Sequence, residues 1–171
     1  NWHDATGSSG QYYLETTLPA DSVLFGDLPG AGNYTVTLDS TVTPAKVTVS
    51  NTLANYVITG SGTIAGPAAL VKGGSGTLVL GNSANTYQGG HWVGTGTLEA
   101  AVDGSLGTGN VTVGAGAALQ LDTPATMNQA ASLTLADGTA GANLNFTGTQ
   151  TVASLSFDGG VTQVATGTWG P

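Results

Sequence analysis

Residues 70–121 read LVKGGSGTLVLGNSANTYQGGHWVGTGTLEAAVDGSLGTGNVTVGAGAALQL. Within them, short runs alternate between apolar and polar residues at Thr77–Leu80, Asn110–Val113 and Ala118–Leu121. Such alternation is typical of strands that place Leu and Val on one face and Thr, Asn or Gln on the other. The segments between the runs are short and rich in Gly, Asn and Ser, which indicates turns rather than crossover helices. The stretch is therefore predicted to be a series of strands that bends repeatedly.

The same stretch resembles the autotransporter-associated beta-strand repeat, also called the passenger-associated transport repeat, of bacterial secreted and surface proteins. The resemblance rests on four motifs in a fixed order: Gly73–Leu78, Asn85–Gly90, Gly96–Leu98 and Leu106–Val113. At His91-Trp92 the chain departs from the family pattern, which has small hydroxyl residues there. The resemblance implies an all-β fold, a right-handed parallel β-solenoid.

The composition limits the classes of partner. Only 7% of the 171 residues are charged, against about 25% in ordinary soluble domains. Ten acidic residues face two lysines, Lys46 and Lys72, and the net charge is −8. A nucleic-acid surface needs many cations to contact phosphates, so nucleic acid is excluded as a partner. Apolar residues are interrupted throughout, so no membrane insertion of this segment is expected. Without cysteine, neither disulfides nor thiolate metal sites can form.

The N-terminal segment up to Gly32 is the least repetitive part of the chain. Four of the eleven aromatic residues lie there: Trp2, Tyr12, Tyr13 and Phe25. The open end of a solenoid needs a cover, and a bulky non-repetitive segment can supply it. We therefore expect residues 1–32 to form an N-terminal cap segment, with one strand at Ser22–Phe25, and residues 33–171 to form the solenoid domain.

Alternating runs on both sides of the quoted stretch predict further strands. These are Tyr34–Leu38, Lys46–Val49, Tyr56–Thr59, Ser132–Leu135, Asn143–Phe146 and Ser154–Phe157, with Val161–Trp169 closing the chain. Their spacing also fits an antiparallel sandwich. The solenoid is favoured because Gly-Thr-Leu/Ile recurs at Gly62, Gly76 and Gly96 and because Asn-Gly and Asp-Gly hairpin pairs are few. Two or three strands per coil would give about six or seven coils.

One loop gathers the residues that could contact a ligand. Tyr87, His91 and Trp92 form this possible ligand loop, since an aromatic ring can stack on a sugar. The alternative use of these residues is structural, in a solenoid turn or a covered groove.

The sequence offers no catalytic constellation. No Gly-x-Ser-x-Gly elbow supports a nucleophile. A glycosidase needs two facing carboxylates about 5 to 10 Å apart. Apart from Asp27 and the N-terminal acids, Glu99 and Asp103 are the only two acidic residues that lie close together in the sequence. We expect no enzymatic activity, no catalytic residue and no cofactor. Because the acidic residues are spread singly, no metal site is assigned. A calcium ion that bridges loops or subunits is the alternative.

The C-terminal third lacks charged side chains from Gly138 to Phe157 and from Gly159 to Pro171. An edge without charge is poorly protected against pairing with another chain, so copies could stack head to tail into a fibre or matrix. The residues expected at that self-assembly interface are Trp2, Tyr12, Tyr13, Val161, Val164 and Trp169. The sequence thus predicts a non-enzymatic structural β-solenoid, secreted or at the bacterial cell surface, that self-assembles. The alternative is an adhesin-type module that recognises a glycan or a neighbouring surface, and a polysaccharide-degrading enzyme is a remote alternative.

Overall fold

A computed structural model describes residues 2–3, 9–11, 21–27, 30–136, 139–157 and 161–163, with side chains described only between 21 and 157. In this part of the chain, strands and the turns between them make up the regular structure, and no helix is long and apolar enough to cross a membrane.

Most strands belong to two sheets, in which all strands are parallel except β16. The six-stranded sheet contains β4 (Gly32–Thr37), β6 (Ala54–Thr59), β8 (Thr77–Leu80), β10 (Thr97–Ala100), β12 (Ala118–Leu121) and β14 (Gly141–Leu144). The eight-stranded sheet contains β3 (Ser22–Phe25), β5 (Lys46–Ser50), β7 (Ala69–Gly73), β9 (His91–Val93), β11 (Val111–Val113), β13 (Ser132–Leu135), β15 (Ser154–Phe157) and β16 (Val161–Gln163). A separate antiparallel pair is formed by β1 (Trp2–His3) and β2 (Ser9–Gln11).

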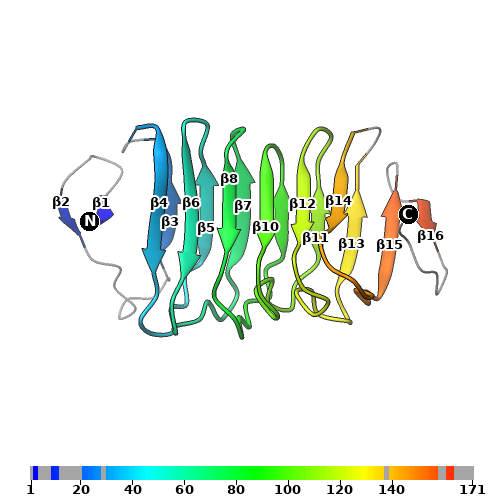
Figure 1. Cartoon of the computed structure of the whole chain (residues 1–171). Coiled ribbons are helices and arrows are strands. Elements are labelled where there is room, and N and C mark those ends of the chain that lie inside the picture. Colours follow the sequence, from blue (N-terminus) through cyan, green and yellow to red (C-terminus); the bar gives the residue numbers. More distant parts are fainter. Residues whose placement is uncertain are drawn as a thin grey trace.

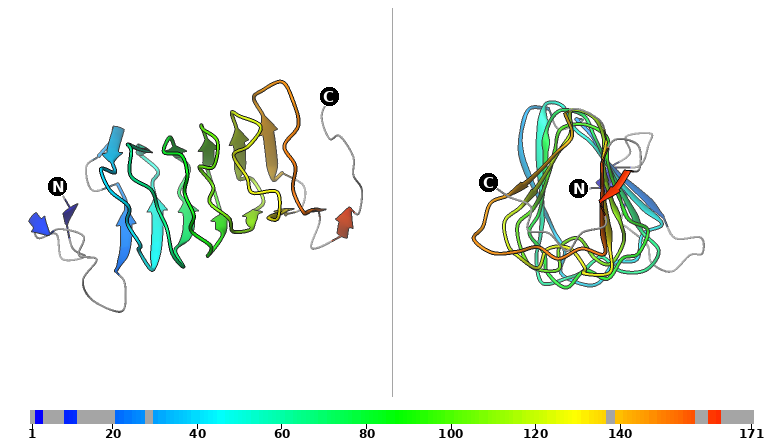
Figure 2. Two further views of the ribbon diagram at one scale, coloured as in Figure 1. Left: turned by 90° about the horizontal axis from the view of Figure 1, so that it is seen from below. Right: turned by 90° about the vertical axis from the view of Figure 1, so that its right-hand side faces the viewer.

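From β3 to β15, consecutive strands alternate between the two sheets, so one coil consists of two strands and their loops. Thr77 of β8 pairs with Thr97 of β10, and Ser22 of β3 pairs with Lys46 of β5, so each residue meets its partner one full coil further along the chain. In Figure 1, the near strands run downward and the far strands upward while the chain advances from left to right, which is a right-handed coil. Figure 2 shows the coils end-on as nested three-cornered outlines. The protein is a parallel β-solenoid, as its sequence predicts.

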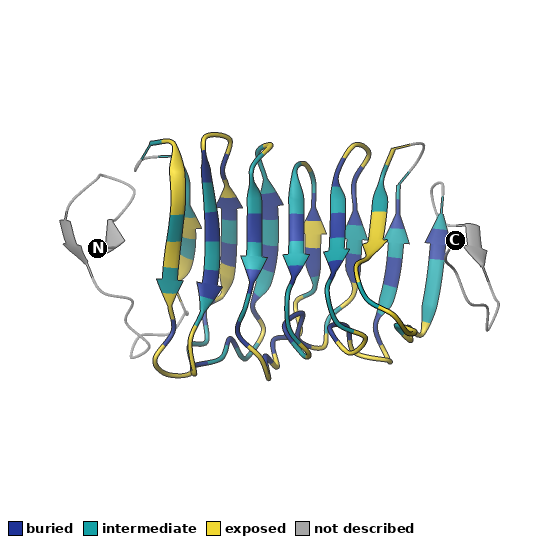
Figure 3. Ribbon diagram, viewed as in Figure 1, coloured by how far each residue is buried: buried dark blue, intermediate teal, exposed yellow. Residues whose placement is uncertain are grey.

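The alternating sequence places every second side chain inside the solenoid, as the buried bands along β6 and β8 show in Figure 3. Because strands in neighbouring coils are in register, inward residues of one type stack in columns. In the six-stranded sheet, one column runs through Leu78, Leu98 and Leu119, all fully buried. In the eight-stranded sheet, the inward columns are apolar except at Lys72 and His91, which pair with Val93 and Val111 of the next coil.

The recurrent Gly-Thr-Leu/Ile motif marks places where one coil lies against the backbone of the coil before. A Cβ at Gly62 would lie 2.2 Å from the Ser40 carbonyl oxygen. At Gly76 it would lie 2.7 Å from the Ala54 carbonyl oxygen, and at Gly96 2.4 Å from that of Gly74. Only glycine fits so close to a neighbouring backbone.

Polar side chains form hydrogen bonds with the backbone groups of the turns between coils. The Asp27 carboxylate accepts hydrogen bonds from the backbone N–H groups of Thr52, Leu53 and Ala54, at 2.9 to 3.0 Å. The bond from Ala54 is the largest cause of a lowered Asp27 pKa. The buried Lys72 ammonium donates to the carbonyls of Gly73 and Gly74 at 2.8 Å, and burial lowers the Lys72 pKa to about 8.

Several predicted strands have the bounds found in the structure: Ser22–Phe25, Thr77–Leu80, Ala118–Leu121, Ser132–Leu135 and Ser154–Phe157. The strand predicted at Asn143–Phe146 begins and ends earlier, as β14, and Phe146 is in a bend. Strand β9 was not predicted at all. The division into a cap at 1–32 and a solenoid from 33 stays a prediction, although β3 already pairs with β5 of the solenoid.

Candidate functional site

The outer face of the eight-stranded sheet carries one large aromatic side chain in the middle of an uncharged row. Val71, Trp92 and Thr112 occupy matching positions on β7, β9 and β11. Thr48 and Thr134 continue the row on the flanking strands. The Trp92 side chain is 49% exposed. A half-exposed indole among small hydroxyl and aliphatic residues makes this face the candidate site.

Trp92 borders a shallow hollow with an empty volume of about 570 Å³, including the open space at its mouth. Its wall combines apolar and polar groups from β7, β9, β11 and the turns before β9 and β11. The lining residues are Ala69, Leu70, Val71, Gln88, Gly89, Gly90, His91, Trp92, Asn110 and Thr112. The hollow therefore offers an aromatic surface beside amide and hydroxyl groups, and no charged side chain lines it.

Glycines create the space at this site. Gly89 and Gly90 contribute no side chains to the wall, and Gly90 has a positive φ of 78°, which glycine adopts without strain. A Cβ at Gly94 would lie 2.9 Å from the indole Nε1 of Trp92. The indole ring can take this position because Gly94 has no side chain.

Tyr87 and His91 lie on the inner side of the same coil. Both side chains are buried, the Tyr87 hydroxyl is hydrogen-bonded to His91 Nε2, and their ring centroids are 5.1 Å apart. Burial lowers the pKa of His91 to about 4, with the Asn110 backbone acting in the opposite direction, and burial raises the pKa of Tyr87. The His91 Nδ1 atom is buried without a hydrogen-bond partner in the described part of the chain.

The three residues of the predicted ligand loop are therefore not displayed together. Trp92 alternates with His91 and Val93 along β9, so its neighbours point inward while it points outward. Direct stacking of a ligand on Tyr87 or His91 is excluded because both side chains are covered. Contact between Trp92 and a ligand stays a prediction.

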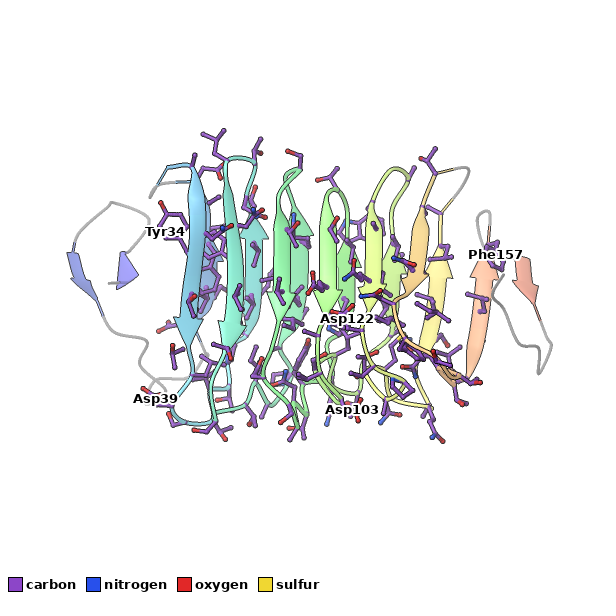
Figure 4. The ribbon with its side chains drawn as sticks, viewed as in Figure 1. Tyr34, Asp39, Asp103, Asp122 and Phe157 are labelled. Carbon is purple, nitrogen blue, oxygen red and sulfur yellow. The ribbon has the colours of Figure 1, made fainter. Side chains whose placement is uncertain are left out.

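A pair of carboxylates occupies the other sheet. Glu99 lies on β10 and Asp122 directly follows β12 in the next coil. The pKa of Glu99 is raised, first by burial and then by the charge of Asp122 and a hydrogen bond with it. Figure 4 shows Asp122 away from Asp103, which lies at the loop edge of the coils. The acid that interacts with Glu99 is thus Asp122 of the next coil, because stacking brings together residues about one coil apart.

Asp122 also accepts hydrogen bonds from Gln120 Nε2 at 2.9 Å and Asn145 Nδ2 at 3.1 Å. These amides hold the carboxylate in an outward-facing polar ladder. Neither acid lines the Trp92 hollow. Among the described residues, no three His, Asp or Glu side chains lie close enough together to hold a metal ion.

The residues predicted at a self-assembly interface lie largely outside the described part. Tyr12, Tyr13, Val164 and Trp169 are not described, while Trp2 and Val161 are described only as backbone in β1 and β16. Strand β16 pairs antiparallel with β15 at the end of the eight-stranded sheet. An interface formed by these six residues stays a prediction.

Comparison with known proteins identifies the repeat. Residues 70–100, from within β7 to the end of β10, match the passenger-associated-transport-repeat family, which confirms the resemblance seen in the sequence. A segment of 101 residues, 57% of this chain, is 45% identical to the adhesin BmaC autotransporter of Brucella suis biovar 1 (strain 1330). That segment spans 3% of the length of the relative. No solved structure matches the chain.

Proposed function

We propose that this chain is part of a non-enzymatic, adhesin-type passenger displayed at the bacterial cell surface or secreted from it. The observation that carries the proposal is the passenger-associated transport repeat over β7 to β10, within a continuous parallel β-solenoid. The relative that is named an adhesin autotransporter supports the same class. Since the matched segment corresponds to 3% of that relative, adhesion by the whole protein is part of the proposal.

The geometry suits a stiff spacer that carries contact surfaces away from the cell. Each coil advances the solenoid by about 4.8 Å while its backbone groups pair with the coils on both sides. Side chains add ladders between coils, such as Asn55 Nδ2 to Asn33 Oδ1 at 3.1 Å and Ser154 Oγ to Ser132 Oγ at 2.8 Å. In this role the chain needs no catalytic group, and its outward-facing residues can vary with what is recognised.

Surface labelling tests this proposal. Antibodies raised against the purified chain should label intact bacteria that carry the gene, or detect the protein in their medium. Labelling that appears only after the cells are permeabilised, with none in the medium, would contradict it. A cytoplasmic protein of the same cells, probed in parallel, reports whether the envelope stayed closed.

Head-to-tail self-assembly is a second candidate, favoured by the ends of the six-stranded sheet. Its terminal strands β4 and β14 have unpaired outer edges among the described residues, and edge strands can pair with another chain. An apolar hollow lined by residues such as Phe25, Val36 and Ile58 lies near the β3–β4 end. The β15–β16 pairing weighs against it, because it ends the parallel stacking of the other sheet. Fibres one solenoid wide in electron micrographs would support assembly, and short single rods at all concentrations would exclude it.

A further inference from the structure

We propose that the hollow beside Trp92 binds a neutral oligosaccharide, with one sugar ring stacked on the indole. This inference rests on the proposed function as a surface adhesin, and it names the class of ligand that the outer face of the solenoid would contact.

The first argument is the chemistry of the wall. One face of a pyranose ring presents C–H groups, while hydroxyls surround its edge. The exposed indole matches the apolar face, since Trp offers a large flat surface with little conformational entropy to lose. The exposed side chains of Gln88 and Asn110 can donate to and accept from hydroxyls. Asn110 uses its Oδ1 to accept from the Ser132 N–H at 2.9 Å, which orients the side chain and leaves its Nδ2 hydrogens for a ligand.

The second argument is charge. Lysine and arginine are the side chains that pair with the charged groups of acidic sugars or phosphates. The chain has two lysines and no arginine. Lys72 is buried on the inner side of β7, and Lys46 does not line the hollow. The chain as a whole carries a net charge of −8, which repels anions. A neutral ligand is the one that this surface favours.

The third argument is direction. The hollow is shallow and open to solvent, so a ligand would lie along the sheet face and would not be enclosed. The row through Val71, Trp92 and Thr112 runs along the solenoid axis, with a step of about 4.8 Å per coil. A chain of sugars lying along the axis would therefore meet a new outward side chain at each coil. A protein partner would instead need about 800 Å² on each side.

The test uses the purified 171-residue chain with chitohexaose and cellohexaose as neutral probes and hexagalacturonic acid as the charged comparison. The chain has three tryptophans, Trp2, Trp92 and Trp169, and single Trp→Phe variants would assign their indole N–H resonances in NMR spectra. At millimolar concentration, at least one neutral hexamer should shift the Trp92 resonance and leave the other two unchanged. The acid should shift none of them.

Variants separate stacking from folding. Trp92→Ala should weaken binding of that hexamer by about tenfold or more, as loss of a Trp anchor does at other interfaces. Trp92→Tyr should retain binding within about threefold, because the ring remains. Leu53→Ala removes another exposed apolar side chain, on the turn before β6, and should leave the affinity unchanged. Thermal melting of each variant verifies that the coils remain folded.

Three results would overturn the inference: no shift with either neutral hexamer, stronger binding of the acid, or unchanged affinity in Trp92→Ala. Trp92-dependent capture of a protein from an extracellular matrix, without glycan binding, would also contradict it in favour of a protein partner. Surface labelling is independent of all these results, so the glycan inference can fail while the proposed function stands.

Discussion

Two single residues interrupt the stack of apolar side chains inside this solenoid. Its inner columns contain Lys72 and His91 at positions where the neighbouring coils have Val or Leu. Each polar group is tied to nearby atoms of the turns or loops: Lys72 to backbone carbonyls and His91 to the Tyr87 hydroxyl. Such buried groups make stability depend on pH, because only one protonation state suits the interior.

Acid should destabilise the protein through His91. Its pKa of about 4 in the folded state lies below the ordinary 6.5, so between these values the unfolded chain binds a proton that the folded chain does not. The stabilisation is complete above pH 6.5 and is lost as the pH falls towards 4, by up to about 3 kcal/mol. Urea unfolding at about pH 7 and about pH 4.5 measures it. His91→Gln should remove this part of the pH dependence, and an unchanged pH profile in the variant would contradict the assignment.

Glu99→Gln should raise the melting temperature near neutral pH by about 1 to 3 °C. The gain is small because solvent screens the interaction of partly exposed charges. Because the pKa of Glu99 is raised in the folded state, its favourable contribution is present below the unfolded pKa and is lost as the pH rises. The gain from the variant should therefore disappear near pH 4. Asp103→Asn, at an exposed loop position, makes the same charge change and serves as the control. An equal gain in both variants would point to net charge instead of the Asp122 contact.

At the scale of the element, close packing of coils depends on glycines whose side-chain space is occupied by backbone. Gly62 has an ordinary φ but no room for a Cβ, whereas Gly141 on β14 has nothing within 4 Å of that position. Gly62→Ala should therefore lower the free energy of unfolding by about 1 to 3 kcal/mol, and Gly141→Ala should change it by less than about 1 kcal/mol. Chemical denaturation of both variants measures the difference. Equal effects would mean that the coils do not approach each other as closely as described.

The strands could be predicted wherever four residues alternate between clear apolar and polar types, as in β8 and β12. Strand β9 escaped prediction because it is very short, follows two glycines, and places the polar His91 on the buried face. The site was only partly predictable for the same reason. Trp92 could be singled out as an unusual aromatic, but its orientation opposite to His91 follows from the strand that was missed.

Contacts between coils were the hardest feature to predict. From β3 to β15, strands that follow each other in sequence, such as β8 and β9, belong to different sheets, and each strand pairs with the next but one along the chain. Nothing in the sequence near Glu99 points to Asp122 as its partner. The coil length, which varies with the loops, has to be known before such pairs can be found.

At the scale of the whole molecule, the solenoid is a stack in which each coil contacts its neighbours. Backbone hydrogen bonds join the coils along the axis, and only 7% of the residues of the chain are charged. A solenoid built in this way can lengthen by adding coils without changing the packing of those already present. Both the outward position of Trp92 and the Glu99–Asp122 pair depend on parallel register between coils.

Disulfide formation between engineered cysteines tests that register most directly, since the natural chain has no cysteine. Thr112 and Thr134 are paired neighbours on β11 and β13, and parallel neighbours about 4.8 Å apart are within disulfide range. The double variant Thr112→Cys/Thr134→Cys should oxidise within the monomer, as read by intact mass and by mobility on non-reducing gels. Thr112→Cys/Gln120→Cys joins consecutive strands that an antiparallel hairpin would pair but that here lie in different sheets, and it should stay reduced. Oxidation of the second pair and not the first would contradict the parallel solenoid.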